Sequence, residues 1–160
     1  MPAMRLPAGL ALLALAAAIF APVGNGRSAS TLVIHVKSVL VSHTLKDVPP
    51  KGLSKGDVAV EHDDLFNTSV RFGRPAHALV GTDRATLTFQ SKTSTLIKGT
   101  ARFPDGTVAF SGIAKQTAST VSVTVPVTGG TGRYAHAQGT VTAGGPATNL
   151  NTYRLTLPYY

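Results

Sequence analysis

Short runs in which apolar and polar residues alternate follow one another along most of the chain. After residue 30, no window of about a dozen residues shows a helical period. The clearest run lies within 120–127, where Val121, Val123, Val125 and Val127 share one face. The strand-like runs cover 31–42, 57–62, 65–72, 77–90, 96–103, 107–113, 120–127, 133–142 and 151–157. The pattern predicts about eight strands at short spacing, typical of an all-β barrel or sandwich.

Two short segments refine this prediction. Pro104-Asp105-Gly106 lies between two of the runs, and each of its residue types favours a tight turn, so we predict a hairpin there. Pro126 lies inside a strand-like run and lacks the N–H that a ladder needs. We therefore expect a bulge or irregular pairing at Pro126.

A glycine-rich segment, Val125–Gly139, contains Val-Thr-Gly-Gly-Thr-Gly and invites a dinucleotide-binding interpretation. That chemistry needs a helix after the glycine turn, whose N-terminus receives the pyrophosphate. The residues that follow favour strands and turns instead, and no acidic residue occurs after Asp105 to bind a ribose. We interpret the segment as a connection between two barrel strands, where glycine allows close approach of the backbone.

The N-terminal residues have the order of a secretory signal. Met1–Arg5 carry one positive charge, residues 6–20 are apolar, and 21–30 are rich in small residues. The apolar run is shorter than the roughly 20 residues that cross a bilayer, although an uncleaved membrane anchor is the alternative. We predict a signal peptide over 1–30 and one barrel domain over 31–160, in a secreted or extracytoplasmic protein.

Charge and composition narrow the range of partners. The chain has 160 residues, a formal charge of +8 and no cysteine. Its basic residues are scattered singly, whereas nucleic-acid binding needs a patch or stripe, so we expect no nucleic-acid partner. Association with an anionic cell envelope is consistent with the charge.

Several motifs, in order, resemble the allene oxide cyclase-like and dirigent barrel family. Gly129–Tyr134 followed by Ala-x-Gly is similar to the family's late strand pair. The other matching segments are Gly56-Asp57 followed by Asp63-Asp64-Leu65 as an early strand and acidic loop, 79–83 as a strand start, and 103–108 with Ser111-Gly112 as a central hairpin. The resemblance covers 31–160 and implies an eight-stranded antiparallel β-barrel with an apolar cavity, often assembled as a trimer.

The resemblance also implies a range of functions. Plant members of the family cyclise an oxylipin epoxide or steer the coupling of phenoxy radicals, and some bacterial relatives catalyse cyclisations in polyketide biosynthesis. We expect an exported barrel that binds a small hydrophobic molecule, or alternatively an isomerase or cyclase, or a cell-envelope structural protein; no cofactor is expected. Two departures stand out: Gln138 replaces an arginine usual in dirigent proteins, and 31–42 contains no acid.

Candidate site residues follow from type and position. The catalytic candidates are His35, Asp64 and Tyr153, and the ligand-binding candidates are His62, Arg133 and Tyr134. Each also has a structural interpretation: a hydrogen-bonded wall histidine, a solvated loop at His62-Asp63-Asp64, or packing at the barrel end.

Two further observations limit the candidates. Asp83-Arg84 is interpreted as a surface pair or a strand-end contact. Five histidines without clustered spacing predict no metal site.

Overall fold

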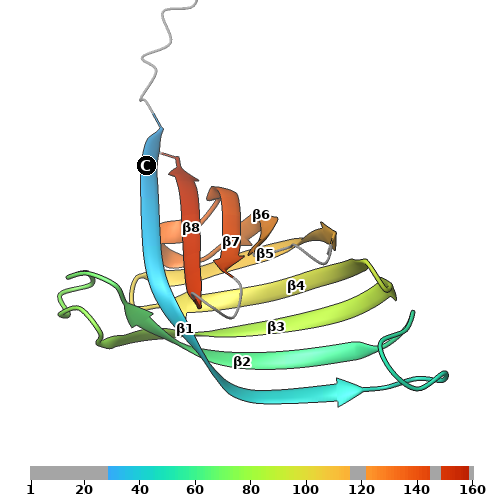
Figure 1. The fold of residues 1–160 in the computed structure, drawn as a ribbon. Helices are drawn as coiled ribbons and strands as arrows, with labels where there is room; N and C mark the ends of the chain where they lie inside the picture. Colours follow the sequence, from blue (N-terminus) through green and yellow to red (C-terminus); the bar gives the residue numbers. More distant parts are fainter. Residues whose placement is uncertain (1–28, 116–121, 145–148, 159–160) are drawn as a thin grey trace, which may run out of the picture.

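The protein forms a closed antiparallel barrel of eight strands in a computed structural model that describes residues 29–115, 122–144 and 149–158. Neighbours along the chain pair with one another, and β8 closes the barrel against β1 (Figure 1). The strands are β1 (Ser30–Lys46), β2 (Val58–Asn67), β3 (Leu79–Ser91), β4 (Ser94–Phe103), β5 (Gly106–Lys115), β6 (Ser122–Gly130), β7 (Gln138–Gly144) and β8 (Leu150–Leu157), with a short 3₁₀ helix η1 (Gly132–Tyr134) before β7. The all-β barrel predicted from the sequence is confirmed.

Some predicted boundaries were wrong. The two short runs at 57–62 and 65–72 form one strand, β2, so Asp63 and Asp64 lie in mid-strand and not in a loop. β2 ends at Asn67 because the Asn67 Nδ2 donates to the carbonyl oxygens of Arg71, Arg74 and Pro75 and so shapes the next turn. The predicted strand over 133–142 begins only at Gln138, since η1 takes up 132–134. Residues 1–28 of the predicted signal segment, residues 120–121 of the predicted strand over 120–127, and residues 159–160 lie outside the described residues, whereas Ser30 already begins β1.

The predicted hairpin between β4 and β5 is confirmed, and its glycine is required. Phe103 pairs with Gly106, and Gly106 has a φ of +144°. A Cβ at Gly106 would lie 2.0 Å from the carbonyl oxygen of Thr131, so the β6–η1 connection packs directly on this turn.

Pairing is irregular beside Pro126, as expected. β5 and β6 are in register only from Val108–Gly130 to Phe110–Val127, with a shift after Ala109. On its other side, Pro126 stays in the ladder opposite Thr140 of β7. β6 therefore follows β7 along its first half and β5 along its second half.

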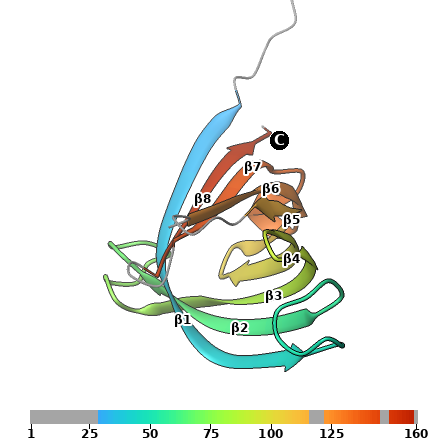
Figure 2. The same cartoon turned by 45° about the vertical axis from the view of Figure 1, so that its right-hand side comes forward.

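The barrel has a narrow, aromatic end and a wide end. At the narrow end Phe103 stacks on Phe72, with ring centroids 5.6 Å apart, and meets Tyr134 and Tyr153 edge-on. Strands β1–β4 are long and form a curved sheet that extends beyond β6–β8 (Figures 1 and 2). Among the described residues, no helix is both long and apolar enough to cross a membrane.

Candidate functional site

Three carboxyl groups face the interior of the barrel from two neighbouring strands. Asp63 on β2 is directly opposite Asp83 on β3, and Glu61 lies two residues earlier on the same face of β2. Side chains on one face of a strand recur every second residue, so the buried Ala59 and Leu65 share this face. Opposite residues of an antiparallel pair have Cβ atoms about 5 Å apart, which makes Asp63 and Asp83 close neighbours.

A tyrosine and a serine reach these carboxyl groups from other strands. The Tyr153 hydroxyl on β8 donates to the Asp83 Oδ2 at 3.3 Å. Since β1 and β2 separate β8 from β3 in the sheet, this hydrogen bond crosses the barrel interior. The Ser38 hydroxyl on β1 donates to the Asp63 Oδ2. Together Ser38, Glu61, Asp63, Asp83 and Tyr153 form what we call the interior acid cluster.

Burial and the repulsion between neighbouring carboxylates shift the pKa values of the groups in the cluster. Burial, followed by the charge of Asp63, raises the pKa of Asp83 to about 6, although the Tyr153 hydrogen bond acts in the opposite direction. Burial and then Asp63 also raise the pKa of Glu61. Burial, and next the charge of Asp83, raise the pKa of Tyr153 well above its ordinary value. Asp83 therefore exchanges a proton near neutral pH while the Tyr153 phenol remains a donor.

Each aspartate of the cluster keeps one oxygen without a hydrogen-bond donor. Among the described residues, neither the Asp63 Oδ1 nor the Asp83 Oδ1 has a hydrogen-bond partner, and both atoms are buried. Buried polar atoms in native proteins are usually satisfied, so two unsatisfied acceptors side by side are typical of a place where a ligand or water binds.

Apolar side chains surround the cluster on the side of the wide end. Leu40 of β1 is opposite Asp63 and is 56% exposed, and Leu45 further along β1 is 48% exposed. On the same inward face, Leu87 of β3 is opposite Ile97 of β4, and both are half-buried. The cluster thus lies between a closed aromatic core and a partly open apolar wall.

Of the residues predicted from the sequence as catalytic, only Tyr153 faces this cluster. His35 is exposed on the outer face of β1, and its Nδ1 lies 3.0 Å from the Thr152 Oγ1. Asp64 follows Asp63 and therefore lies on the outer face of β2. The predicted ligand residue His62 also faces outward.

His62 and Asp64 line a groove on the outside of β2–β4. The groove has a volume of about 410 Å³, and Arg84, Arg102 and the two aspartates Asp63 and Asp83 also line it. The side chains of His62 and Asp64 face outward, whereas those of Asp63 and Asp83 face the barrel interior, so the groove and the interior acids share the same stretch of β2 and β3.

The other two predicted ligand residues lie near η1. The Arg133 side chain is 58% exposed and forms an ion pair with Asp105 at 3.4 Å. Tyr134 is fully buried against Phe103, and its hydroxyl has no hydrogen-bond partner among the described residues. Burial, and then the nearby Asp105, raise the pKa of Tyr134 to about 12. Tyr134 belongs to the narrow-end core and does not line an open mouth.

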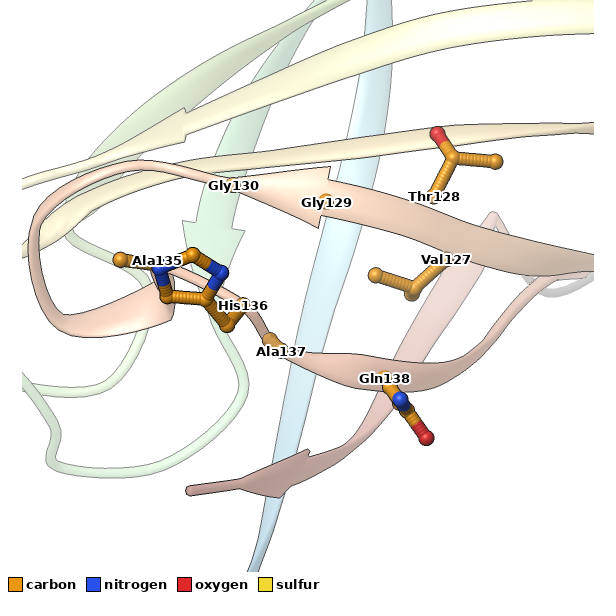
Figure 3. A pocket seen from close by; sticks show the side chains of 8 residues that line it. All are labelled: Val127, Thr128, Gly129, Gly130, Ala135, His136, Ala137 and Gln138. Atoms are coloured by element: carbon orange, nitrogen blue, oxygen red, sulfur yellow. The ribbon is translucent and has the colours of Figure 1, made fainter. Parts of the chain in front are cut away.

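A hollow of about 590 Å³ lies between the end of β6 and residues 135–138. Figure 3 shows its lining, where the His136 ring and the polar side chains of Thr128 and Gln138 lie among small and aliphatic residues. No carboxyl group lines this hollow, in contrast to the interior acid cluster.

Glu61, Asp63 and Asp83 were not predicted as site residues from the sequence. Asp83 was interpreted as part of a surface pair with Arg84, but it is only 9% exposed, because adjacent strand residues point to opposite faces. The signal that could have found the cluster is the alternation Ala59-Glu61-Asp63-Leu65-Asn67, once these residues are assigned to one strand. No group of three or more potential ligands among the described residues is arranged to hold a metal ion.

Comparisons with known proteins agree with this architecture. Residues 37–155 match the family described as "Allene oxide cyclase barrel like domain". No curated protein matches the sequence.

Three solved structures illustrate the likeness. A pyocyanin demethylase is 27% identical, with a TM-score of 0.61 over 81% of this chain and 100% of that one. A pterocarpan synthase dirigent protein is 17% identical, with a TM-score of 0.59 over 83% and 86% of the two chains. An exo-specific intermolecular Diels-Alderase is 16% identical, with a TM-score of 0.61 over 80% and 96%. The last two establish a shared fold only.

Proposed function

The chain belongs to the allene oxide cyclase-like barrel family, and from this premise we propose that it holds a small, largely apolar molecule inside the barrel and moves a proton on it, as an isomerase or cyclase does. The observation that carries the proposal is the hydrogen bond across the barrel from the Tyr153 hydroxyl to the buried Asp83. It joins a proton acceptor and a proton donor next to an apolar wall.

The chemistry needs only these two side chains. The ionised Asp83 accepts a proton from a carbon or oxygen of the bound molecule, and the neutral carboxyl then returns it to another atom of the same molecule. The substrate rearranges with no net gain or loss of atoms or electrons. Because the pKa of Asp83 lies at about 6, both of its protonation states are populated near neutral pH, which favours general acid–base catalysis.

The positions of the two groups support different roles. Tyr153 is fully buried, and its raised pKa keeps its hydroxyl protonated, so it remains a hydrogen-bond donor to Asp83. Asp83 keeps its Oδ1 free of hydrogen bonds from the described residues, so this oxygen is the one that accepts the substrate's proton. The 27%-identical barrel of the pyocyanin demethylase supports an enzymatic rather than a structural role.

The test uses 5-nitrobenzisoxazole, a neutral aromatic compound whose ring opens when a base removes its only ring C–H proton on the isoxazole. The electron pair of that C–H bond forms the nitrile, the N–O bond breaks, and its electron pair passes to the oxygen, so the ring opens to a single coloured cyanophenolate. We expect the purified protein to accelerate this reaction with a rate that rises through an apparent pKa near 6. Asp83→Asn should lower the rate by about 10²-fold.

Two variants serve as controls. Tyr153→Phe should move the midpoint of the rate profile to higher pH, because the Tyr153 hydrogen bond lowers the pKa of Asp83. Asp64→Asn removes the same charge from the outer face of β2 and should leave the profile unchanged. An Asp83→Asn protein as active as the parent would refute proton transfer by Asp83, and bound but unreacted probe would indicate a ligand carrier.

A further inference from the structure

The interior acid cluster also restricts the charge of the molecule that the barrel accepts. Resting on the proposed function of this same site, we propose that the ligand is an organic cation, with N–H donors on a small apolar frame, and not a lipid carboxylate.

The interior is negatively charged although the protein as a whole is basic. Of the seven acidic residues in the chain, three belong to the interior acid cluster: Glu61, Asp63 and Asp83. The lysines and arginines of β1–β4 all occupy outward, exposed positions: Lys37, Lys46, Arg84, Lys98 and Arg102. His43 is the one basic side chain on the inward face of these strands, and it is opposite Glu61, not the aspartates.

Among the described residues, no positively charged side chain forms an ion pair with Asp63 or Asp83. Their charged neighbours inside the barrel are each other and Glu61, and the remaining titratable contact is the Tyr153 hydroxyl. The ion pair found among the described residues, Arg133–Asp105, lies on the surface near η1. Like charges this close are destabilising unless a cation or a proton compensates them.

Two buried oxygens in the cluster lack a hydrogen-bond donor among the described residues. Ser38 and Tyr153 donate to the Oδ2 atoms of Asp63 and Asp83, and both Oδ1 atoms remain without partners. An ionised carboxylate only accepts hydrogen bonds, so the complementary ligand group must donate. A protonated amine has several N–H donors and the opposite charge, and charge-assisted hydrogen bonds are about twice as strong as neutral ones.

The apolar wall fits the rest of such a ligand. Leu40 lies opposite Asp63, and Leu87 and Ile97 face inward beyond the cluster. These side chains would cover an aromatic or aliphatic frame, while the aspartates fix the position of its charged nitrogen. A fatty-acid carboxylate would instead place a third negative group beside Asp63 and Asp83.

The test compares three probes with the same ring system: naphthalen-1-ylmethanamine, naphthalen-1-ylmethanol and 1-naphthoate. At pH 7.5 we expect the amine, which is protonated, to bind at least about tenfold more tightly than the alcohol, and the carboxylate to bind weakest. Asp63→Asn and Asp83→Asn should each reduce this preference, and the double variant should abolish it. Asp64→Asn, which removes a charge from the outer face, should retain it. Naphthalene fluorescence and calorimetry measure the three dissociation constants.

The outcomes separate this inference from the proposed function. Equal binding of amine and alcohol, tighter binding of the carboxylate, or no binding of any probe would overturn the inference. If the cation preference fails but Asp83→Asn still abolishes ring opening of the neutral nitrobenzisoxazole, the proton-transfer function stands alone. A cation preference without that activity would support the inference and refute the catalytic role. Circular dichroism melts verify that each variant is folded.

Discussion

Asp83 is a residue that the fold holds in unfavourable surroundings. Its side chain is 9% exposed, its neighbour across the strands is another aspartate, and one of its oxygens has no donor among the described residues. A site selected for stability alone would replace such a carboxyl with an amide or an apolar group. Groups with this combination of burial and like charge are typical of functional sites.

Replacing Asp83 with asparagine should therefore stabilise the protein at neutral and alkaline pH. An acid whose pKa is raised on folding, here from 3.8 to about 6, contributes its full stability below pH 3.8 and loses it as the pH rises through 6. This difference between the folded and unfolded pKa values of Asp83 corresponds to about 3 kcal/mol in the free energy of unfolding, as an upper estimate. Urea unfolding at pH 4 and pH 8 measures this effect. The variant should have a higher free energy of unfolding than the parent at pH 8 only.

Asp64→Asn is the matched control for this measurement, since it lies one residue from Asp63 on the outer face of β2. It should show no comparable dependence on pH. An Asp83→Asn variant whose stability differs from the parent equally at both pH values would show that the ionised Asp83 carries no burial penalty.

At the residue scale, the sequence alone identified one member of the cluster. Tyr153 was selected because a tyrosine within a strand can offer a hydroxyl to a cavity. The acids were missed because Asp83 is followed by Arg84, and Asp63 by Asp64, so each appeared as a surface cluster of charge. Only the assignment of one continuous strand to 58–67 shows that alternate residues turn inward.

At the scale of the elements, the β4–β5 hairpin and the β6–η1 connection depend on each other. Gly106 of the hairpin approaches the carbonyl oxygen of Thr131, and the Arg133 N–H donates to the Asp105 carbonyl oxygen at 2.8 Å. The Thr107 and Thr131 hydroxyls are 2.8 Å apart. The β4–β5 turn and the β6–η1 connection, 24 residues apart in the sequence, thus pack against each other.

Gly106→Ala tests this contact between the turn and the connection. The added Cβ would lie 2.0 Å from the Thr131 oxygen, so either the hairpin or the connection must move. We expect a loss of roughly 3 kcal/mol or more in the free energy of unfolding. Gly52→Ala is the matched control, because Gly52 also has a positive φ, +88°, but nothing lies within 4 Å of its added Cβ.

Gly52→Ala should lower the free energy of unfolding by only about 1 kcal/mol, because it strains the backbone without creating a close contact. Equal losses in the two variants, measured by thermal and urea unfolding, would mean that the close approach of Gly106 to Thr131 contributes nothing.

Strand positions were predicted well from the sequence and strand ends less so. The turn at 104–106 was found because proline, aspartate and glycine each favour it locally. The end of β2 was missed because it depends on the buried Asn67 side chain and three carbonyl groups of a later loop, a tertiary arrangement with no local pattern.

At the scale of the whole molecule, the aromatic core that closes one end of the barrel reaches the acid cluster through the contact of Phe103 with Tyr153. The loop after β2 folds over the narrow end, where the Arg71 guanidinium donates to the Val33 carbonyl oxygen and lies 5.7 Å from the centre of the Phe72 ring. Phe72 in turn stacks on Phe103. This loop seals the aromatic core, whereas the exposed Leu40 and Leu45 lie toward the other end.

Arg71→Ala should destabilise the barrel, and because Arg71 is not among the groups that shift the pKa of Asp83, that pKa should change little. Losing the charged hydrogen bond and the contact with the ring should cost about 2 kcal/mol. The midpoint of the nitrobenzisoxazole rate profile should remain near that of the parent. Arg74→Ala, which removes an exposed hydrogen bond to the Leu79 carbonyl oxygen, should cost less. A shifted midpoint in Arg71→Ala would mean that the two ends are coupled.

The closed barrel itself could be predicted from the sequence, because regular short strands and the ordered family motifs both indicate it. The charge of its interior could not, because it depends on the register between β2 and β3, which places Asp63 opposite Asp83. Register follows from long-range pairing and not from composition.

The alternation of faces along β2 also limits how the length of this protein can change during evolution. Inserting or deleting a single residue within β2 would exchange its two faces, so that His62 and Asp64 would replace Glu61, Asp63 and their apolar neighbours inside the barrel. Such a change alters every interior contact of the strand at once, and no single later substitution restores them. We therefore expect gains and losses of residues mainly in the segments between strands, 47–57 and 68–78 on either side of β2, while the interior diversifies by substitution in place.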